Sequence, residues 1–144
     1  MANAKQLSVF VDNKPNQLTG VMAVLKENGI NIRALSLADT SDFGILRIIV
    51  NDTDKANEIL KAAGYAVTVT EIIAVTIPDA PGQLSRVLDV LGGENVNLEY
   101  LYAFTGASDK SVSFVIRVDD NSAAESALTK AGIIILTEQD IAEM

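Results

Sequence analysis

The stretch that determines the fold is Asp79-Ala80-Pro81-Gly82-Gln83-Leu84. It matters because a related stretch occurs earlier in the chain, Asn13-Lys14-Pro15-Asn16-Gln17-Leu18. The agreement continues on both sides of each stretch, and further along the chain Asn31 matches Asn97. A long segment that matches itself in register indicates an internal repeat, which governs the interpretation of the whole fold. The sequence therefore predicts the duplication of a unit of roughly 70 residues.

Each copy, residues 1–71 and 72–144, carries the pattern of a βαββαβ module. In the first copy Leu7, Val9 and Val11 stand at every second position, which predicts a half-buried strand. The apolar positions that define the two helices of this copy are Leu18, Val21, Met22, Leu25, Ala56, Ile59, Leu60 and Ala63. Two βαβ halves with helices on one face predict an α+β fold of two ferredoxin-like modules in tandem, each with an antiparallel sheet.

Two features of the pattern concern how the copies assemble. Residues 65–77 run without a turn signal, so the last strand of the first copy is expected to pass directly into the first strand of the second. Phe10, Leu37 and Ile49 are predicted to lie on the sheet face opposite the helices. Because that face is then apolar as well, we expect the two copies, or two chains, to pack together over it.

The composition excludes several function classes. The chain has 144 residues, no Cys and no His, so thiol chemistry and the commonest general base and metal ligand are absent. A net charge of −8 opposes binding to nucleic acid or to an anionic membrane. No apolar run approaches the ~20 residues of a membrane helix, and no secretory signal is evident, so a soluble cytoplasmic protein is expected. The scattered carboxylates do not indicate a metal site.

The motifs resemble those of the ACT domain, a small ligand-binding module with βαββαβ order. That family has Asp-x-Pro-Gly-x-Leu where the first strand meets the first helix, and Ile/Val-Asn-Ile/Val at the second strand. The second copy has the full first motif in residues 79–84 and a close match to the other in Val96-Asn97-Leu98. The first copy has Ile30-Asn31-Ile32, but Asn13 and Asn16 replace the Asp and the Gly. The resemblance covers essentially the whole chain.

The resemblance implies a regulatory function. ACT domains generally bind amino acids or similar effectors at interfaces between paired modules and so control metabolic enzymes or transcription; tandem pairs resemble the regulatory tail of aspartokinases. It implies a homodimer that binds an amino acid and acts on an enzyme, with no cofactor and no catalytic residue. The ligand-binding positions that it implies are Asp79, Ala80, Pro81, Gly82, Gln83, Leu84, Asn97 and Leu98 in the second copy and Asn13, Asn16, Gln17, Leu18, Asn31 and Ile32 in the first.

The chemistry of these residues fits a free amino acid. A helix start offers unpaired N–H groups and the positive end of the helix dipole to the carboxylate. Gly82 would allow close approach of the backbone, Asp79 would pair with the ammonium, and the amide of Asn97 would hold either group. Since Asn13 offers no negative charge, we expect the stronger site to lie around Asp79.

Other interpretations remain open at this point. Pro15 and Pro81 are also favourable first residues of ordinary helices. Tyr100, Tyr102 and Phe104 would line a ligand pocket or, as is commoner for aromatic residues on a strand, belong to a core or interface. Catalysis and RNA recognition are disfavoured by the missing nucleophiles and by the negative charge. The serious alternative is a protein–protein interaction module that binds no small molecule.

Overall fold

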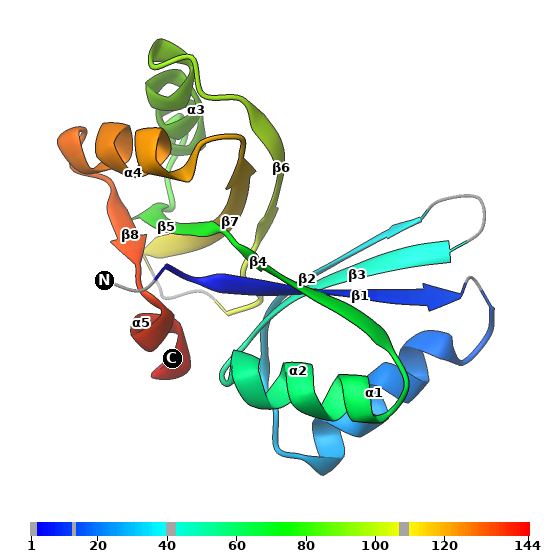
Figure 1. Cartoon of the computed structure of the whole chain (residues 1–144). Helices are drawn as coiled ribbons and strands as arrows, with labels where there is room; N and C mark the ends of the chain where they lie inside the picture. The colour runs from blue at the N-terminus through cyan, green and yellow to red at the C-terminus, as the bar shows by residue number, and fades with distance from the viewer. Residues whose placement is uncertain (1–2, 13, 40–42, 107–109) are drawn as a thin grey trace.

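The computed structural model describes residues 3–12, 14–39, 43–106 and 110–144 (Figure 1). Within these ranges the chain forms two βαββαβ modules, each with one four-stranded antiparallel sheet, followed by a short extra helix. This confirms the predicted fold class. The first module comprises β1 (Lys5–Asp12), α1 (Gln17–Glu27), β2 (Ile32–Asp39), β3 (Phe43–Val50), α2 (Thr53–Ala62) and β4 (Ala66–Glu71). The second comprises β5 (Ile73–Pro78), α3 (Gln83–Gly93), β6 (Leu98–Ala103), β7 (Ser111–Val118), α4 (Asn121–Lys130) and β8 (Ile134–Leu136), and α5 (Glu138–Ala142) follows it.

The two sheets have the same topology. Their strand orders are β2-β3-β1-β4 and β6-β7-β5-β8, and in each module the two helices pack on one face of the sheet. The first core lies between that face and its helices, where Leu7 and Val9 of β1 meet Val21 of α1 and Leu60 of α2. The alternating residues of β1 are therefore buried as the period of two requires. None of the helices in the described ranges has the length and apolar character needed to cross a bilayer.

A β-bulge overturns the expectation for Leu37. The register of β2 against β3 shifts between Ile32 and Ala34, so these two residues point to opposite faces of the sheet. A slip of one residue moves every later side chain to the other face. Leu37 consequently pairs with Leu46, lies on the helix side of the sheet and is 54% exposed. Ile49 does lie on the opposite face, as expected, and is only 1% exposed.

The second module covers part of this open face. β4 passes into β5 with only Ile72 between them, and the Ile72 N–H donates to the carbonyl of Ala4 at 3.0 Å. A third core, distinct from those of the two modules, gathers at this crossing. Its buried members are Ala4, Ala34, Ile49, Ile72, Ala74, Phe104, Val115 and Ile141. The two copies thus pack together within one chain through the sheet faces that carry no helices.

The C-terminal helix α5 belongs to this contact rather than to either module core. Thr137 caps it, accepting from the Asp140 N–H at 3.1 Å while the Asp140 carboxylate accepts from the Thr137 N–H at 2.8 Å. Ile141 is buried in the third core, and Arg33 of β2 donates from Nη2 to the backbone carbonyl of Met144. Figure 1 shows α5 (red) beyond β8, next to the start of α2. The helix therefore joins the end of the second module to the first.

Candidate functional site

The turn before α3 contains the second-copy motif, residues 79–84. Gly82 stands before the first residue of the helix with φ of 83°, a left-handed conformation that glycine adopts without strain. No side chain caps this helix, and in the described part of the chain the N–H groups of Leu84 and Ser85 have no hydrogen-bond partner. Asp79, Ala80 and Pro81 are exposed beside it. The turn thus presents free donors at the positive end of a helix.

The first copy repeats this turn. Asn16 precedes α1 with φ of 70°, again left-handed and again without a side-chain cap. By contrast, α2 and α4 are capped by Asp52 and Asp120, which accept from backbone N–H groups at 3.2 and 3.0 Å. Asn tolerates the left-handed region better than most residues. Asn13, the residue that replaces the acid, lies outside the described residues.

The structure separates Asp79 from Asn97 within the second module. Asp79 follows Pro78, which pairs with Ser111 at the start of β7. Asn97 lies beyond the other end of β7: its N–H donates to the Asp119 carboxylate at 3.0 Å, and its carbonyl accepts from the Asp119 N–H at 3.2 Å. Ser111 and Asp119 are eight residues apart along this strand, so at ~3.3 Å per residue the two positions are roughly 26 Å apart. One amino acid cannot touch both residues in the same module.

The same separation holds in the first module. The Asn31 N–H donates to the side-chain oxygen of Asn51 at 2.9 Å, and the Asn51 N–H donates to the Asn31 carbonyl at 3.1 Å. Asn51 follows the end of β3, whereas the turn before α1 lies near Phe43 at its start, because Asp12 pairs with Phe43. Sequence spacing could not show this separation, since the intervening helix returns the chain to the opposite end of the sheet. Ile32 and Leu98, the first residues of β2 and β6, share the ends that hold Asn31 and Asn97.

Hollows lie against the turn before α1. A cavity of about 240 Å³ is lined by Lys14, Leu18 and Leu37, and one of about 520 Å³ by Phe10, Phe43 and Tyr65. Asp12 and Gln17 line both. Of the positions implied by the family resemblance, Gln17 and Leu18 therefore border cavities, and a carboxylate in either hollow would lie beside the uncapped start of α1. Gln83 and Leu84 are the half-buried counterparts in the second copy.

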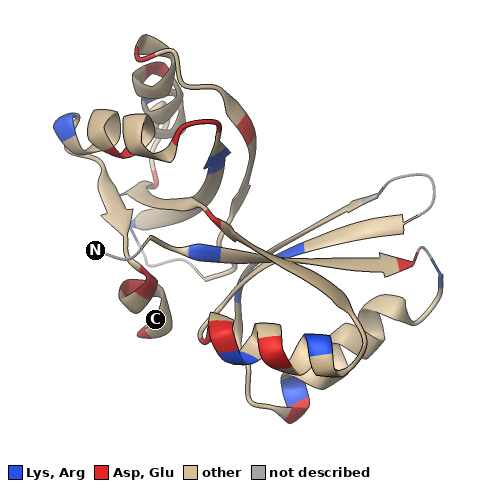
Figure 2. Cartoon of the chain, viewed as in Figure 1, with Lys and Arg blue, Asp and Glu red and all other residues tan. Residues whose placement is uncertain are grey.

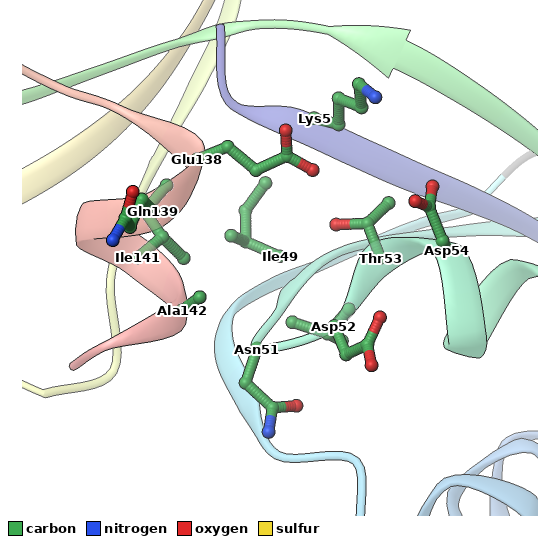
Figure 3. Close-up of a pocket in the computed structure, with 11 residues that line it drawn as sticks. Lys5, Ile49, Asn51, Asp52, Thr53, Asp54, Glu138, Gln139, Ile141 and Ala142 are labelled. Atoms are coloured by element: carbon green, nitrogen blue, oxygen red, sulfur yellow. The ribbon is translucent and has the colours of Figure 1, made fainter. Parts of the chain in front are cut away.

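A further cavity, of about 420 Å³, lies where the two modules meet (Figure 3). Lys5, Ile49 and Asp54 line it from the first module, and Glu138, Ile141 and Ala142 line it from α5. None of the positions implied by the family resemblance lines it, although Asn51, the partner of Asn31, does. Sequence reasoning missed these residues because α5 was not predicted. The available signal was Thr137-x-x-Asp140 before an apolar residue, the pattern of a helix start.

A polar cluster also joins the open faces of the two sheets. Gln6 of β1 is 0% exposed; its Nε2 donates to the hydroxyls of Tyr100 and Ser8 at 2.8 and 3.2 Å, and its Oε1 accepts from the Tyr102 hydroxyl at 2.6 Å. The guanidinium of Arg47 lies 4.0 Å from the ring centre of Tyr100, within cation–π range. Both tyrosines thus belong to the interface between modules.

The same burial affects the titration of Tyr102. Desolvation, together with the neighbouring Tyr100, raises the pKa of its phenol above the ordinary value, and Arg47 opposes this only in part. The hydroxyl therefore stays protonated and remains a donor to Gln6 at neutral pH.

Comparison with known proteins bears on the family and the fold. The family model of an ACT domain pair matches residues 2–144. The chain belongs to the ACT domain pair family. The resemblance predicted from the motifs is confirmed. An ACT domain pair is a regulatory module, and no catalytic family is indicated for this chain. No curated protein matches the chain.

Several solved structures resemble this chain in fold. A Bacteroides thetaiotaomicron protein is 38% identical, with a TM-score of 0.93 over 99% of this chain and 97% of that one. The regulatory subunit of aspartate kinase from Thermus thermophilus is 17% identical, with a TM-score of 0.65 over 91% of this chain and 93% of that one. Its Thermus flavus counterpart is 18% identical, with a TM-score of 0.61 over 92% and 94%. The two aspartate kinase subunits share the fold of this ACT domain pair.

Proposed function

We propose that this ACT domain pair senses a free amino acid at an interface between paired modules and passes the bound state to a metabolic enzyme or regulator. The observation that carries the proposal is the pair of uncapped helix starts, each preceded by a left-handed residue, Asn16 or Gly82. Free N–H groups at a helix start suit a carboxylate. The fold shared with regulatory subunits of aspartate kinase adds support by analogy of fold alone.

A second module is needed to complete each motif site. Because roughly 26 Å separates Asp79 from Asn97, an amino acid on the Asp79 turn takes its remaining contacts from another module. We therefore propose a homodimer. Phe10 and Phe43 support it: their ring centres are 6.0 Å apart, and they are 36% and 39% exposed on the first sheet.

The proposed role is regulatory and not catalytic, and we assign it to the cytoplasm, where free amino acids and the enzymes that make them occur together. An effector shifts such an equilibrium only through different affinities for two arrangements of the modules, with a coupling of typically ~1–3 kcal/mol. The third core, shared by both modules, is the structure through which such a shift would travel.

The test is a thermal-shift screen of the twenty amino acids. A free amino acid at 100 times its Kd adds about 2.7 kcal/mol to the free energy of unfolding, which raises Tm by several degrees. We expect one or two amino acids to do so with wild-type protein, and Asp79→Ala to weaken the response. Asp89→Ala, which removes an exposed acid from α3 away from the turn, is the matched control. If no amino acid raises Tm, the proposal fails and the protein-interaction alternative takes its place.

A further inference from the structure

The cavity of about 420 Å³ between the modules has the size of a small-molecule site. It lies apart from the motif turns, and its two walls come from different parts of the fold. β1, β3 and the start of α2 form one wall, and α5 forms the other. A molecule bound there would touch the first module and α5, the helix that follows the second module, at once.

The floor of the cavity is apolar. Ile49 is 1% and Ile141 is 3% exposed, and both belong to the third core, while Ala142 adds a methyl group at the edge. An apolar side chain of a ligand would continue this core instead of meeting water. The floor therefore favours a ligand with a small hydrocarbon group.

The rim carries charges of both signs. Figure 3 shows the Glu138 side chain reaching from α5 into the cavity, with Lys5 and Asp54 on the side of the first module. In the described ranges, none of these three side chains takes part in a hydrogen bond or an ion pair. The Asp52 carboxylate also lines the cavity but caps α2, so one ammonium and two carboxylates remain to match the two charges of a zwitterion.

We infer that this cavity is a second amino-acid site, which takes a zwitterionic α-amino acid with an apolar side chain. Lys5 receives the carboxylate, Glu138 and Asp54 receive the ammonium, and the side chain lies on Ile49 and Ile141. This inference rests on the proposed function, because it gives the sensed amino acid a place inside one chain.

Such a ligand would strengthen the attachment of α5 to the first module. In the absence of a ligand, this attachment includes Ile141 in the third core and the bond from Arg33 to the Met144 carbonyl. A zwitterion held by Glu138 on one side and by Lys5 on the other adds a charged link across the cavity. The bound state thereby favours the closed arrangement of the two modules over looser ones.

The experiment titrates L-valine, L-leucine and L-methionine into full-length protein labelled at isoleucine δ1-methyl groups, with calorimetry in parallel. We expect at least one of them to shift the methyl signals of Ile49 and Ile141 while Ile116, in the core of the second module, stays unchanged. Glu138→Gln and Lys5→Met should each weaken that binding at least tenfold. Glu143→Gln changes the same charge outside the cavity, where Glu143 accepts from Gln139, and should have no effect.

The outcomes separate this inference from the proposed function. Binding that shifts Ile49 and Ile141 and is lost in both cavity variants supports the inference. If an amino acid binds but Asp79→Ala alone abolishes it, the cavity site is wrong and the sensor proposal stands. If the three apolar amino acids fail while another of the twenty raises Tm, the same conclusion follows. If none of the twenty binds, both are wrong.

Discussion

Gln6 is the residue on which the contact between the modules depends most directly. Its amide is fully buried between two sheets and exchanges hydrogen bonds with Tyr100, Tyr102 and Ser8. A buried amide is tolerated because its donors and acceptor are satisfied, and removing one partner leaves a costly unpaired group. The network thereby specifies one relative position of the modules, which apolar contacts alone would specify less strictly.

Replacing Tyr102 by Phe tests this. The substitution leaves Gln6 Oε1 without its donor at 2.6 Å, so we expect the free energy of unfolding to fall by about 1–3 kcal/mol in urea titrations. Tyr65→Phe is the control, because in the described residues the Tyr65 hydroxyl has no hydrogen-bond partner. Equal losses in the two variants would contradict the importance of the network.

The raised pKa of Tyr102 also predicts a pH dependence at the residue scale. The folded protein holds the phenolic proton more tightly than the unfolded chain, in which Tyr ionises near pH 10. The contribution of Tyr102 to the free energy of unfolding is therefore complete below about pH 10. It declines as the pH rises further, by up to about 1.4 kcal/mol per pH unit. Tyr102→Phe should flatten the slope measured between pH 10 and 11. An unchanged slope would show that Tyr102 does not contribute to it.

At the scale of elements, Pro15 and Pro81 lie two residues before the starts of α1 and α3, so the sequence predicted these starts closely, whereas it missed α5. Asp52 caps α2, and α3 begins at Gln83 within the motif of residues 79–84. These signals succeed because a cap depends on residues within one turn of the helix. The side predicted for Leu37 was wrong, because the β-bulge near the start of β2 is defined only by its pairing with β3, where Ile32 faces Val50 and Ala34 faces Ile49.

We predict opposite effects on stability for alanine substitutions at two glycines, one before α3 and one within it. Gly82→Ala forces a side chain into a left-handed conformation, so we expect a loss of about 1 kcal/mol even though the space around it is open. Gly92→Ala, inside the helix with equally open surroundings, should gain about 0.5–1 kcal/mol. Chemical denaturation of both variants measures the difference. If Gly82→Ala is neutral, the turn does not depend on its positive φ.

At the scale of the whole molecule, the third core decides whether the two modules behave as one unit. It contains residues of both modules and of α5, and the crossing strand is anchored there through Ile72. Modules that share a buried core are expected to unfold together. The acidic and basic residues, by contrast, are spread over the helices and over strands of both sheets (Figure 2).

Ile49→Ala tests this cooperation. Truncating a side chain that is 1% exposed should reduce the free energy of unfolding by about 2–5 kcal/mol. It should lower the Tm of a single unfolding transition, because both modules lose the same contact. Leu37→Ala removes a similar volume at a site that is 54% exposed and should change stability by about 0.5 kcal/mol or less. Calorimetry showing two transitions, with only one displaced in Ile49→Ala, would contradict a shared core.

The sequence by itself determined the duplication, the order of strands and helices and the family. Those features could be predicted because local periodicity, helix caps and an internal repeat are visible in the sequence without three-dimensional contacts. The tertiary structure alone decided that Asp79 and Asn97 lie at opposite ends of a sheet, that Gln6 is buried and that α5 closes a cavity over Ile49. Each of these depends on which distant segments pack together, and long-range packing leaves no periodic signal in the chain.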